Sequence, residues 1–303
     1  MQIGFVGLGK MGGNMVHRIR RDSDHEVVAF DYSADAVKTA EEQGAAGAGS
    51  LQGLVEQLSA PRAVWIMVPA GDATQKTIEE LLGLLSEGDM IVDGGNSKWT
   101  DSVARHAQCG ERGVHFVDVG TSGGVWGLEV GYCMMVGGDE EPVGRLAPIL
   151  DVLAPPDGWG HMGGAGSGHF VKMVHNGIEY GLMQAYAEGF ELLHKSEYGL
   201  DMEAISKLWG QGSVVRSWLL ELAALAFESD GNDLHALEGY VEDSGEGRWT
   251  LESGIDHDVP MPVLASSLFA RFASRGNGDY SARLLAALRN QFGGHAVKAA
   301  PKS

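Results

Sequence analysis

The chain has 303 residues, 44% of them hydrophobic, and its 41 acidic and 22 basic residues give a formal net charge of −19. This charge argues against nucleic acid as a partner, because phosphate backbones are bound by basic surfaces. No apolar run approaches the roughly 18 residues of a membrane span, and the N-terminus leads directly into a strand, so we expect a cytoplasmic protein with no signal peptide and no membrane partner. Cys109 and Cys133 lack metal-ligand spacing, and we predict neither a disulfide nor a metal site.

Short apolar strands alternate with helices in the first part of the chain. We expect strands at 2–6, 26–30, 63–68, 90–93, 115–119 and 132–136, with helices between them. This alternation predicts an α/β fold with a doubly wound, mostly parallel sheet that helices cover on both faces. After the glycine-rich segment 163–168 the strand signals stop. Apolar periodicity at 169–196, 201–228 and 262–274 then predicts an all-α C-terminal domain.

The first strand runs into a glycine-rich turn, Gly7-Leu8-Gly9-Lys10-Met11-Gly12, which opens a helix. In this context the glycines permit a tight turn and let a pyrophosphate approach the helix N-terminus. The second strand ends in Asp31, followed by Tyr32, and an acid there suits the ribose hydroxyls of NAD and repels the 2′-phosphate of NADP. We therefore expect NAD, with NADP as the alternative cofactor. The alternative role for Asp31 is that of a turn or helix-capping residue.

These features divide the chain into a dinucleotide-binding Rossmann domain, 1–165, and a helical domain for substrate binding and oligomerisation, 166–303. The start of the helical domain carries an unusual polar stripe. At about 100° per residue, its members fall within about 100° of arc on one helix. They are Lys172, His175, Asn176 and Glu179, and the residues off the stripe are the apolar Phe170, Val171, Met173, Val174 and Ile178. We expect this helix to be buried, since buried polar groups are costly unless they serve a site; the alternative is a solvated face.

The residue types on the stripe suit oxidation of an alcohol followed by loss of CO₂. Hydride transfer from a secondary alcohol needs a base, and a lysine desolvated on a buried helix can have its pKa lowered enough to serve. Protonated Lys172 would then stabilise the oxyanion that develops when the neighbouring carboxylate of a 3-hydroxy acid leaves, without a metal. Glu179, two turns further along, is placed to protonate the carbon of the resulting enediol.

Over nearly its whole length the chain resembles a decarboxylating 6-phosphogluconate dehydrogenase, in a short form with one helical unit instead of two. The segments shared with the wider β-hydroxyacid dehydrogenase superfamily are Asp93–Ser97, Gly120–Gly124 and Gly163–Asn176. Those typical of the 6-phosphogluconate enzymes are His175, Glu179, Tyr180, Ser213–Ser217, Gly247–Thr250 and Arg289–His295. The resemblance implies oxidative decarboxylation of 6-phospho-D-gluconate to ribulose 5-phosphate, in pentose phosphate or gluconate metabolism, with Lys172 as base and Glu179 as acid.

The resemblance also implies the remaining site residues. The residues that it implies for contact with the substrate are Asn96, Ser122, Gly123, Gly124, His175 and Asn176. Those that it implies for contact with the substrate's phosphate are Tyr180, Arg248, Thr250, Arg216 and Arg289. It adds Val68, Pro69, Ala70 and Asn96 to the cofactor contacts of the glycine-rich turn, Asp31 and Tyr32. Two positions depart from the family pattern: Arg248 stands where lysine is usual, and Val68-Pro69-Ala70 replaces Val-Lys-Ala. Asn96 and Ser122–Gly124 would otherwise be turn residues.

In the family the C-terminal tail reaches the neighbouring subunit, so the resemblance implies a homodimer or homotetramer in which Arg289 and His295 complete the partner's site. Two other functions stay open. A non-decarboxylating β-hydroxyacid dehydrogenase of the 3-hydroxyisobutyrate type would share Lys172 and Asn176, but would not need Glu179 or the phosphate-binding arginines. A catalytically silent NAD-binding protein would have a degraded polar stripe, whereas this stripe is intact.

Overall fold

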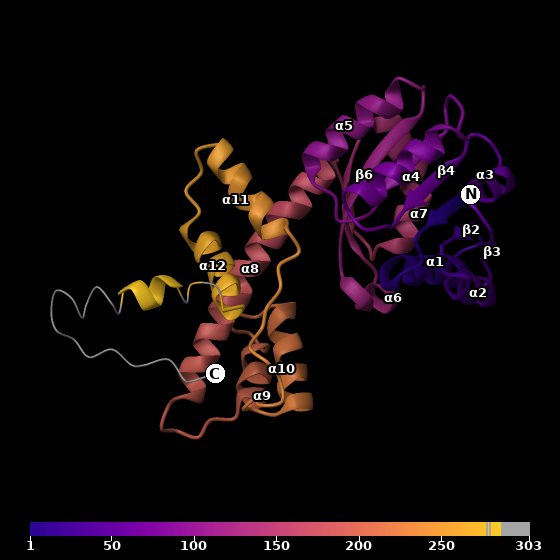
Figure 1. The fold of residues 1–303 in the computed structure, drawn as a ribbon. Coiled ribbons are helices and arrows are strands. Elements are labelled where there is room, and N and C mark those ends of the chain that lie inside the picture. The colour runs from indigo at the N-terminus through magenta and orange to yellow at the C-terminus, as the bar shows by residue number, and fades with distance from the viewer. Residues whose placement is uncertain (277, 279, 286–303) are drawn as a thin grey trace, which may run out of the picture. The chain divides into compact units, whose positions relative to one another are not determined.

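The computed structural model describes residues 1–276, 278 and 280–285 (Figure 1). The chain divides into two compact units, Met1–His175 and Asn176–Ser303. The division falls inside helix α8 (Ser167–His194), whereas the sequence suggested residue 165. The difference arises because the first turns of α8 pack against the sheet of the first unit, as shown below.

Unit 1 contains an eight-stranded sheet with the order β3-β2-β1-β4-β5-β6-β7-β8. The strands are β1 (Gln2–Val6), β2 (Glu26–Phe30), β3 (Ala46–Gly47), β4 (Ala63–Ile66), β5 (Met90–Asp93), β6 (His115–Ser122), β7 (Cys133–Gly137) and β8 (Trp159–Gly163). Neighbours are parallel except β6 and β7, which are antiparallel. The doubly wound, mostly parallel sheet that we predicted is therefore confirmed.

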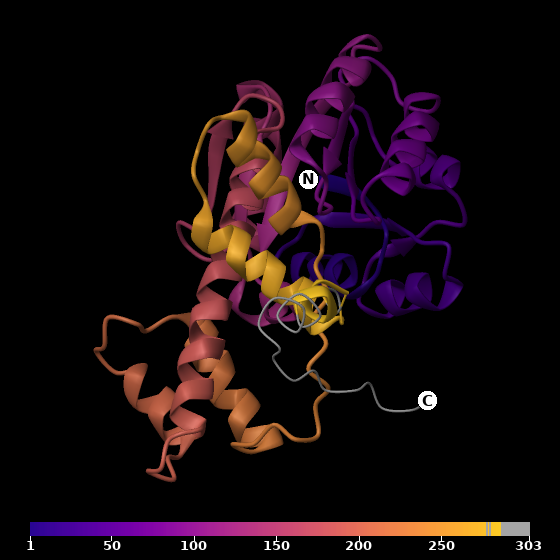
Figure 2. The same ribbon diagram turned by 60° about the vertical axis from the view of Figure 1, so that its left-hand side comes forward.

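Helices cover both faces of this sheet (Figures 1 and 2). They are α1 (Lys10–Asp22), α2 (Ala34–Glu42), α3 (Leu51–Gln57), α4 (Asp72–Leu82), α5 (Trp99–Gly110), the 3₁₀ turn η1 (Gly124–Trp126), α6 (Gly127–Val130) and α7 (Glu140–Leu153). Alternate strand residues enter two separate hydrophobic cores, since successive side chains point to opposite faces. On β4, for example, Trp65 belongs to the core beneath α1 and α7, while Val64 and Ile66 belong to the core beneath α3 and α4.

Several strand predictions were wrong in detail. The sequence did not indicate β3, which is only two residues long, or β8, whose Trp-Gly-His-Met-Gly sequence has no apolar alternation. Strand β4 ends at Ile66, two residues before the predicted end, because the chain then turns through Pro69, which has no N–H for the ladder. Strand β6 extends to Ser122 because it pairs with β7 as far as Cys133.

Unit 2 is helical, and no strand occurs among its described residues. Besides most of α8 it contains α9 (Met202–Trp209), α10 (Trp218–Asp230), α11 (Glu246–Asp256) and α12 (Pro262–Ser274). The apolar-periodic segment 201–228 contains two helices, because Gly212 has a φ of +76° and the Ser217 hydroxyl caps a new helix by accepting from the N–H of Leu220. Across the described part of the chain, no helix combines the length and the apolar character that a membrane span requires.

Helix α8 is less buried than we expected. Met173 and Tyr180 are 1% and 5% exposed, but Ile178 is 52% exposed and Leu182 and Met183 are 45% and 40% exposed. In unit 2, α11 and α12 lie against α8 (Figures 1 and 2), and Gly177 admits Thr250 and Leu264 at close range. The few helices of this unit cover one side of α8 and leave part of its apolar surface exposed in the single chain.

A buried ion pair lies behind the carboxyl end of β5. Arg105 Nη1 is 3.0 Å from Asp93 Oδ2, and the two side chains are only 3% and 0% exposed. Arg105 also donates to the hydroxyl of Ser97 and to the side-chain oxygen of Gln75. A charge in such a place is tolerated only while its partner is present.

Replacing Arg105 with Met should therefore lower the free energy of unfolding of unit 1 by about 3–5 kcal/mol, because the Asp93 carboxylate is left buried without its cation. Urea denaturation checks this value. Glu129→Gln serves as the control: its ion pair with Arg21, 3.3 Å between Oε2 and Nη1, is at the surface and should contribute less than about 1 kcal/mol. Equal stability of Arg105→Met and Glu129→Gln would contradict the argument.

Candidate active site

A cavity of about 920 Å³ opens in unit 1 at the carboxyl edge of the parallel strands. Gly7 follows β1, Asp31 follows β2, Val68 follows β4 and Asn96 follows β5, and all four line it. Strand β1 pairs with β2 on one side and β4 on the other, so the cavity lies at the point where the strand order reverses. Ligands of open α/β sheets bind at this place. All the predicted cofactor-binding residues line the cavity except Leu8, which is buried in the core, and Ala70.

The three glycines of the turn meet different constraints. A Cβ at Gly7, whose φ is +94°, would lie 2.5 Å from the carbonyl oxygen of Met67, and one at Gly12 would lie 2.0 Å from that of Gly7. A Cβ at Gly9 would meet no protein atom within 4 Å. Gly9 is also the N-cap of α1, which has no side-chain cap and no acidic residue in its first turn. The N-terminus of α1 thus fits the pyrophosphate of a dinucleotide.

Asp31 is both a cavity residue and a turn residue. Its carboxylate accepts the N–H of Leu8 at 2.7 Å and the N–H of Ser33 at 2.8 Å, which ties the glycine-rich turn to the end of β2. The turn role that we kept as an alternative is therefore present. A carboxylate has about four lone-pair sites, so acceptor capacity remains for a ribose hydroxyl. The neighbouring Tyr32 is 87% exposed.

Helix α8 begins in direct contact with β6 and β7. A Cβ at Gly120 of β6 would lie 2.3 Å from the Cβ of Lys172, and one at Gly168 would lie 2.5 Å from the carbonyl oxygen of Met135. Glycine at these positions lets the backbones of the helix and the strands approach closely. The contact leaves Lys172 only 7% exposed and fixes its backbone on the sheet. The predicted stripe is confirmed as part of one helix, since Lys172, His175, Asn176 and Glu179 all belong to α8.

The loop after β6 has a conformation that requires glycine. Gly123 and Gly124 have φ values of +131° and +53°, and they follow the half-buried Ser122 at the end of the strand. This end of β6 lies at the same edge of the sheet as the loop carrying Asn96, because β5 and β6 are parallel neighbours. The loop offers a hydroxyl and backbone N–H groups, which suit a carboxylate.

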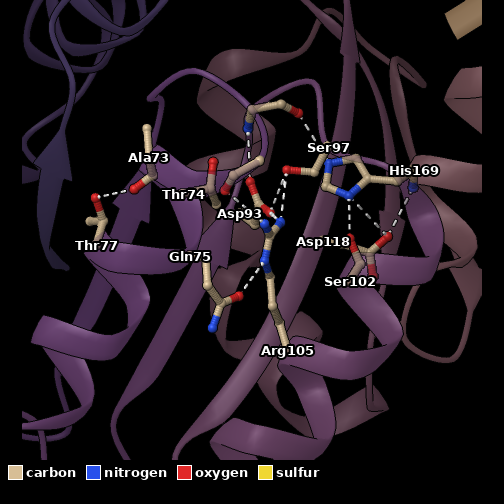
Figure 3. Close-up of polar contacts among 12 residues, drawn as sticks. Ala73, Thr74, Gln75, Thr77, Asp93, Ser97, Ser102, Arg105, Asp118 and His169 are labelled. Atoms are coloured by element: carbon tan, nitrogen blue, oxygen red, sulfur yellow. Dashed lines mark hydrogen bonds and ion pairs between the residues drawn. The ribbon is translucent and has the colours of Figure 1, made fainter. Parts of the chain in front are cut away.

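Two buried carboxylates support these segments (Figure 3), and the sequence analysis gave neither of them a role. Asp118 of β6 accepts the N–H of Gly166 at 2.7 Å and that of His169 at 2.9 Å, so it caps the start of α8 from a neighbouring strand. Asp93 stabilises the loop that follows β5 and carries Asn96: its carboxylate accepts hydrogen bonds from the hydroxyl of Ser97 and from the guanidinium of Arg105. A carboxylate inside the apolar run Phe116–Val119 was the available signal, because an acid is buried in a strand only when it has partners.

The residues predicted to hold the phosphate are partly brought together in unit 2. Arg271 places its guanidinium 3.5 Å from the ring centroid of Tyr180, whose hydroxyl accepts the N–H of Ser244 at 3.2 Å. Thr250 is buried and its hydroxyl donates to the carbonyl of Glu246. Arg271 was not among the predicted residues, although a lone arginine in an apolar helix was a usable signal.

Arg248 is engaged by an aspartate. Its Nε and Nη2 donate to Asp243 at 2.9 and 3.1 Å, and Arg275 donates to the same carboxylate at 2.9 Å. Hydrogen bonds from Arg248, and then from Arg275, lower the pKa of Asp243 to about 2. Arg216 lies elsewhere in unit 2, where it lines a separate cavity of about 420 Å³ with Tyr186 and Trp209.

The remaining predicted residues are the two near the C-terminus of the chain. Arg289 and His295 lie outside the described residues. The cofactor cavity also receives Ala73, Lys76 and Thr77 from α4, which the motif search did not include. An amphipathic helix that begins just after the third parallel strand could have indicated them, since such helices start at the ligand-binding edge.

Comparisons with known proteins agree with this architecture. Residues 2–174 match the NAD binding domain of 6-phosphogluconate dehydrogenase, and residues 168–280 match the 6-phosphogluconate dehydrogenase C-terminal domain. An NAD(+)-dependent, decarboxylating 6-phosphogluconate dehydrogenase of Haloferax volcanii is 48% identical over 298 residues, which cover 98% of each chain. A decarboxylating 6-phosphogluconate dehydrogenase of Lactococcus lactis subsp. lactis is 37% identical over 89% of this chain, but the match spans only 61% of that longer protein.

Solved structures show the same fold. The 6-phosphogluconate dehydrogenase of Plasmodium falciparum aligns with a TM-score of 0.82 at 26% identity, over 100% of this chain and 67% of its own. A 3-hydroxyisobutyrate dehydrogenase of Mycobacterium tuberculosis aligns with a TM-score of 0.72 at 24% identity, over 92% and 94% of the two chains, which shows a common fold alone. Because both domains match in order and a relative of equal length is 48% identical, the chain belongs to the 6-phosphogluconate dehydrogenase family.

Proposed function

We propose that this protein catalyses the oxidative decarboxylation of 6-phospho-D-gluconate to ribulose 5-phosphate and CO₂, with NAD as the hydride acceptor. The observation that carries the proposal is the buried Lys172, fixed against β6 on a helix that also bears Glu179. Its relative of equal length in Haloferax volcanii is named for the same NAD-dependent, decarboxylating reaction. The cavity at the carboxyl edge of the sheet fits the dinucleotide.

The roles follow from the chemistry of each group. Lys172 accepts the proton of the C3 hydroxyl, and the bound nicotinamide supplies the hydride acceptor. Protonated Lys172 then donates to the oxygen of the new ketone and stabilises its negative charge while the adjacent carboxylate leaves as CO₂. Glu179 protonates the carbon that lost the carboxylate, and Lys172 takes back the enol proton. Ser122–Gly124, Asn96, His175 and Asn176 orient the substrate for these steps.

We assign the substrate phosphate to two arginines of unit 2, Arg248 and Arg271, which we call the arginine group. Planar guanidinium groups match phosphate oxygens with paired hydrogen bonds. Arg271, stacked on Tyr180, joins Arg248 in this role, whereas the position of Arg216 in a separate cavity does not support its assignment. A 3-hydroxyisobutyrate-type dehydrogenase would have no use for such a group, which is why we favour the phosphorylated substrate.

The purified protein should form NADH and CO₂ in equal amounts from 6-phosphogluconate, and should be far less active on gluconate or 3-hydroxyisobutyrate. Lys172→Met should reduce both products by roughly 10²–10⁴-fold, since the base acts before decarboxylation can begin. Glu179→Gln should also be strongly impaired, with the loss in the proton-transfer step after hydride transfer. Single-turnover measurement of NADH, released CO₂ and ribulose 5-phosphate separates the two roles, because Glu179 acts only after NADH and CO₂ have formed.

Lys195→Met is a matched control, because Lys195 is an exposed lysine just beyond the end of α8. It should retain wild-type turnover. Near-normal activity of Lys172→Met or Glu179→Gln would refute the assignment of that residue. Preference for 3-hydroxyisobutyrate would favour the non-decarboxylating alternative, and inactivity with every substrate despite NAD binding would favour a silent NAD-binding protein.

Asp31 bears on the choice between NAD and NADP. A carboxylate near the 2′-phosphate of NADP forms a like-charge pair worth a few kcal/mol in a partly buried site. Replacing Asp31 and Tyr32 with Asn and Arg should therefore shift the ratio of kcat/KM values toward NADP. The ratio is the proper measure, because Asp31 also accepts two backbone N–H groups and its loss should weaken the turn for both cofactors. Asp35→Asn, an exposed acid of α2, should leave the ratio unchanged; higher efficiency of the wild type with NADP would overturn the assignment.

We further propose a homodimer or homotetramer in which the C-terminal tail completes the neighbouring site. Apolar residues of α10 and α12 support this: Leu225, Val263 and Phe269 are 46%, 65% and 60% exposed, although Leu220 and Phe227 are buried within unit 2. Such a surface on a small helical unit favours cover by another chain.

Mixing inactive Lys172→Met chains with inactive His295→Ala chains should then restore activity, because some sites would combine an intact lysine with an intact tail. Native mass spectrometry should verify that mixed oligomers form, and unmixed preparations of each variant are the controls. A fully active monomer, or mixed oligomers without recovered activity, would exclude the shared site.

A further inference from the structure

A buried imidazole lies one turn before Lys172, and the reaction scheme does not use it. His169 is only 2% exposed and belongs to the first turn of α8. Its Nδ1 is 2.7 Å from the hydroxyl of Ser102, and its Nε2 is 3.1 Å from the carbonyl oxygen of Gly95 (Figure 3). Both ring nitrogens are therefore engaged with groups from other elements of unit 1.

The carbonyl partner of Nε2 fixes the position of one ring proton. A backbone carbonyl only accepts, so Nε2 of His169 must carry a proton and donate to Gly95. The hydroxyl of Ser102 is the hydrogen-bond partner of Nδ1, which also lies 3.9 Å from Asp118 Oδ2, so both ring nitrogens have partners. A buried imidazole fixed in this way has one orientation, because turning it would leave the Gly95 carbonyl without its donor.

The bond to Gly95 acts on the residue that follows. The Gly95 carbonyl belongs to the peptide group that joins Gly95 to Asn96, and this group is planar, so its orientation also sets the direction of the Asn96 N–H. The N–H of Gly95 is held separately by Asp93 Oδ1 at 3.2 Å. Asn96 lines the cofactor cavity. Asp93 therefore holds the peptide group before Gly95, and His169 holds the peptide group between Gly95 and Asn96.

The backbone of His169 is anchored as firmly as its ring. Its N–H donates to Asp118 of β6, which also receives the N–H of Gly166. The contact of Gly120 and Gly168 holds the same turn of α8 on the sheet. A single residue therefore connects the loop that carries Asn96 with the helix turn that carries Lys172.

From this arrangement we propose that His169 is a positioning residue that couples the loop 93–97 to the start of α8, and so keeps Asn96 in register with Lys172. The consequence for catalysis rests on the proposed function, whereas the coupling itself does not. A misplacement of about 1 Å between reacting groups can cost roughly 10²-fold in rate. In this proposal His169 fixes the position of Asn96 relative to Lys172 through the protein alone and makes no contact with substrate or cofactor.

Four variants test the proposal. His169→Leu removes both ring hydrogen bonds, and His169→Gln keeps an amide donor near the position of Nε2. Ser102→Ala is a milder change that removes only the partner of Nδ1. It replaces His169→Leu as the disrupted variant if His169→Leu does not fold. Asp89→Asn is the matched control, since Asp89 is 1% exposed and bonds Arg62 and Ser86 at the opposite end of β5.

The first measurement is hydrogen exchange of the full-length protein, followed by mass spectrometry, which needs no substrate. His169→Leu should speed exchange about tenfold or more in both 93–97 and 167–173, because the link between them is lost. Ser102→Ala should speed exchange in both segments to a smaller extent, because the ring keeps its bond to Gly95 but loses the hydroxyl that fixes its orientation. His169→Gln should restore most of the protection in both segments, and Asp89→Asn should leave both unchanged. Unchanged exchange in either segment of the disrupted variant would overturn the coupling, whatever the substrate proves to be.

The second measurement is the deuterium isotope effect on kcat with 6-phosphogluconate labelled at C3. Misplacement should lower kcat by roughly 10–100-fold and raise the isotope effect, because hydride transfer becomes the slow step, while His169→Gln should recover to within about fivefold. A smaller fraction of folded enzyme would lower kcat with an unchanged isotope effect, and that result would overturn the positioning role. A wild type inactive on 6-phosphogluconate would instead refute the proposed function, and the exchange data would still decide the coupling.

Discussion

The close packing of α8 against β6 and β7 is the constraint on which the candidate site depends. A side chain at Gly120 or Gly168 would strike Lys172 or the backbone of the facing strand, so only glycine allows this distance. The packing ties Lys172 to a regular element instead of a loop, and regular elements hold reacting groups more exactly in place. It also buries the polar N-terminal turn of α8, which creates a need for buried hydrogen-bond partners.

Two aspartates meet that need from neighbouring strands. Asp93 of β5 and Asp118 of β6 are register partners in the sheet, and both are completely buried. Asp93 directs its oxygens to the loop that follows β5, before Asn96, and Asp118 directs its oxygens to the first turn of α8, which follows β8 in the chain. Arg105 balances one of the two carboxylates, and the N-terminus of α8 favours the other. Polar networks whose members are all bonded specify one geometry, which is what a site built from separate segments requires.

Relatives of different length place the helical unit in context. The Haloferax volcanii protein matches over 98% of its own length, whereas the Lactococcus lactis protein matches over 61%. This chain contains the glycine-rich turn, the polar helix, Arg248 and Arg271 within its 303 residues. It leaves apolar helix surface exposed in unit 2.

Local patterns in the sequence were sufficient for the strand–helix order, the G-x-G-x-x-G turn, Asp31 and the stripe from Lys172 to Glu179, because these depend on periodicity and spacing within one segment. They were not sufficient for β8, for the break between α9 and α10, or for Arg271 on Tyr180. Nor did they reveal that Asp118, His169 and Gly95 form one connected group, since these residues lie far apart in the chain and meet only when β6 receives the first turn of α8. The sequence by itself determined which chemical groups are present and on which elements they lie. Only the tertiary structure decided which buried groups hold them, because hydrogen-bond partners in a core are chosen by packing between segments and not by their separation along the chain.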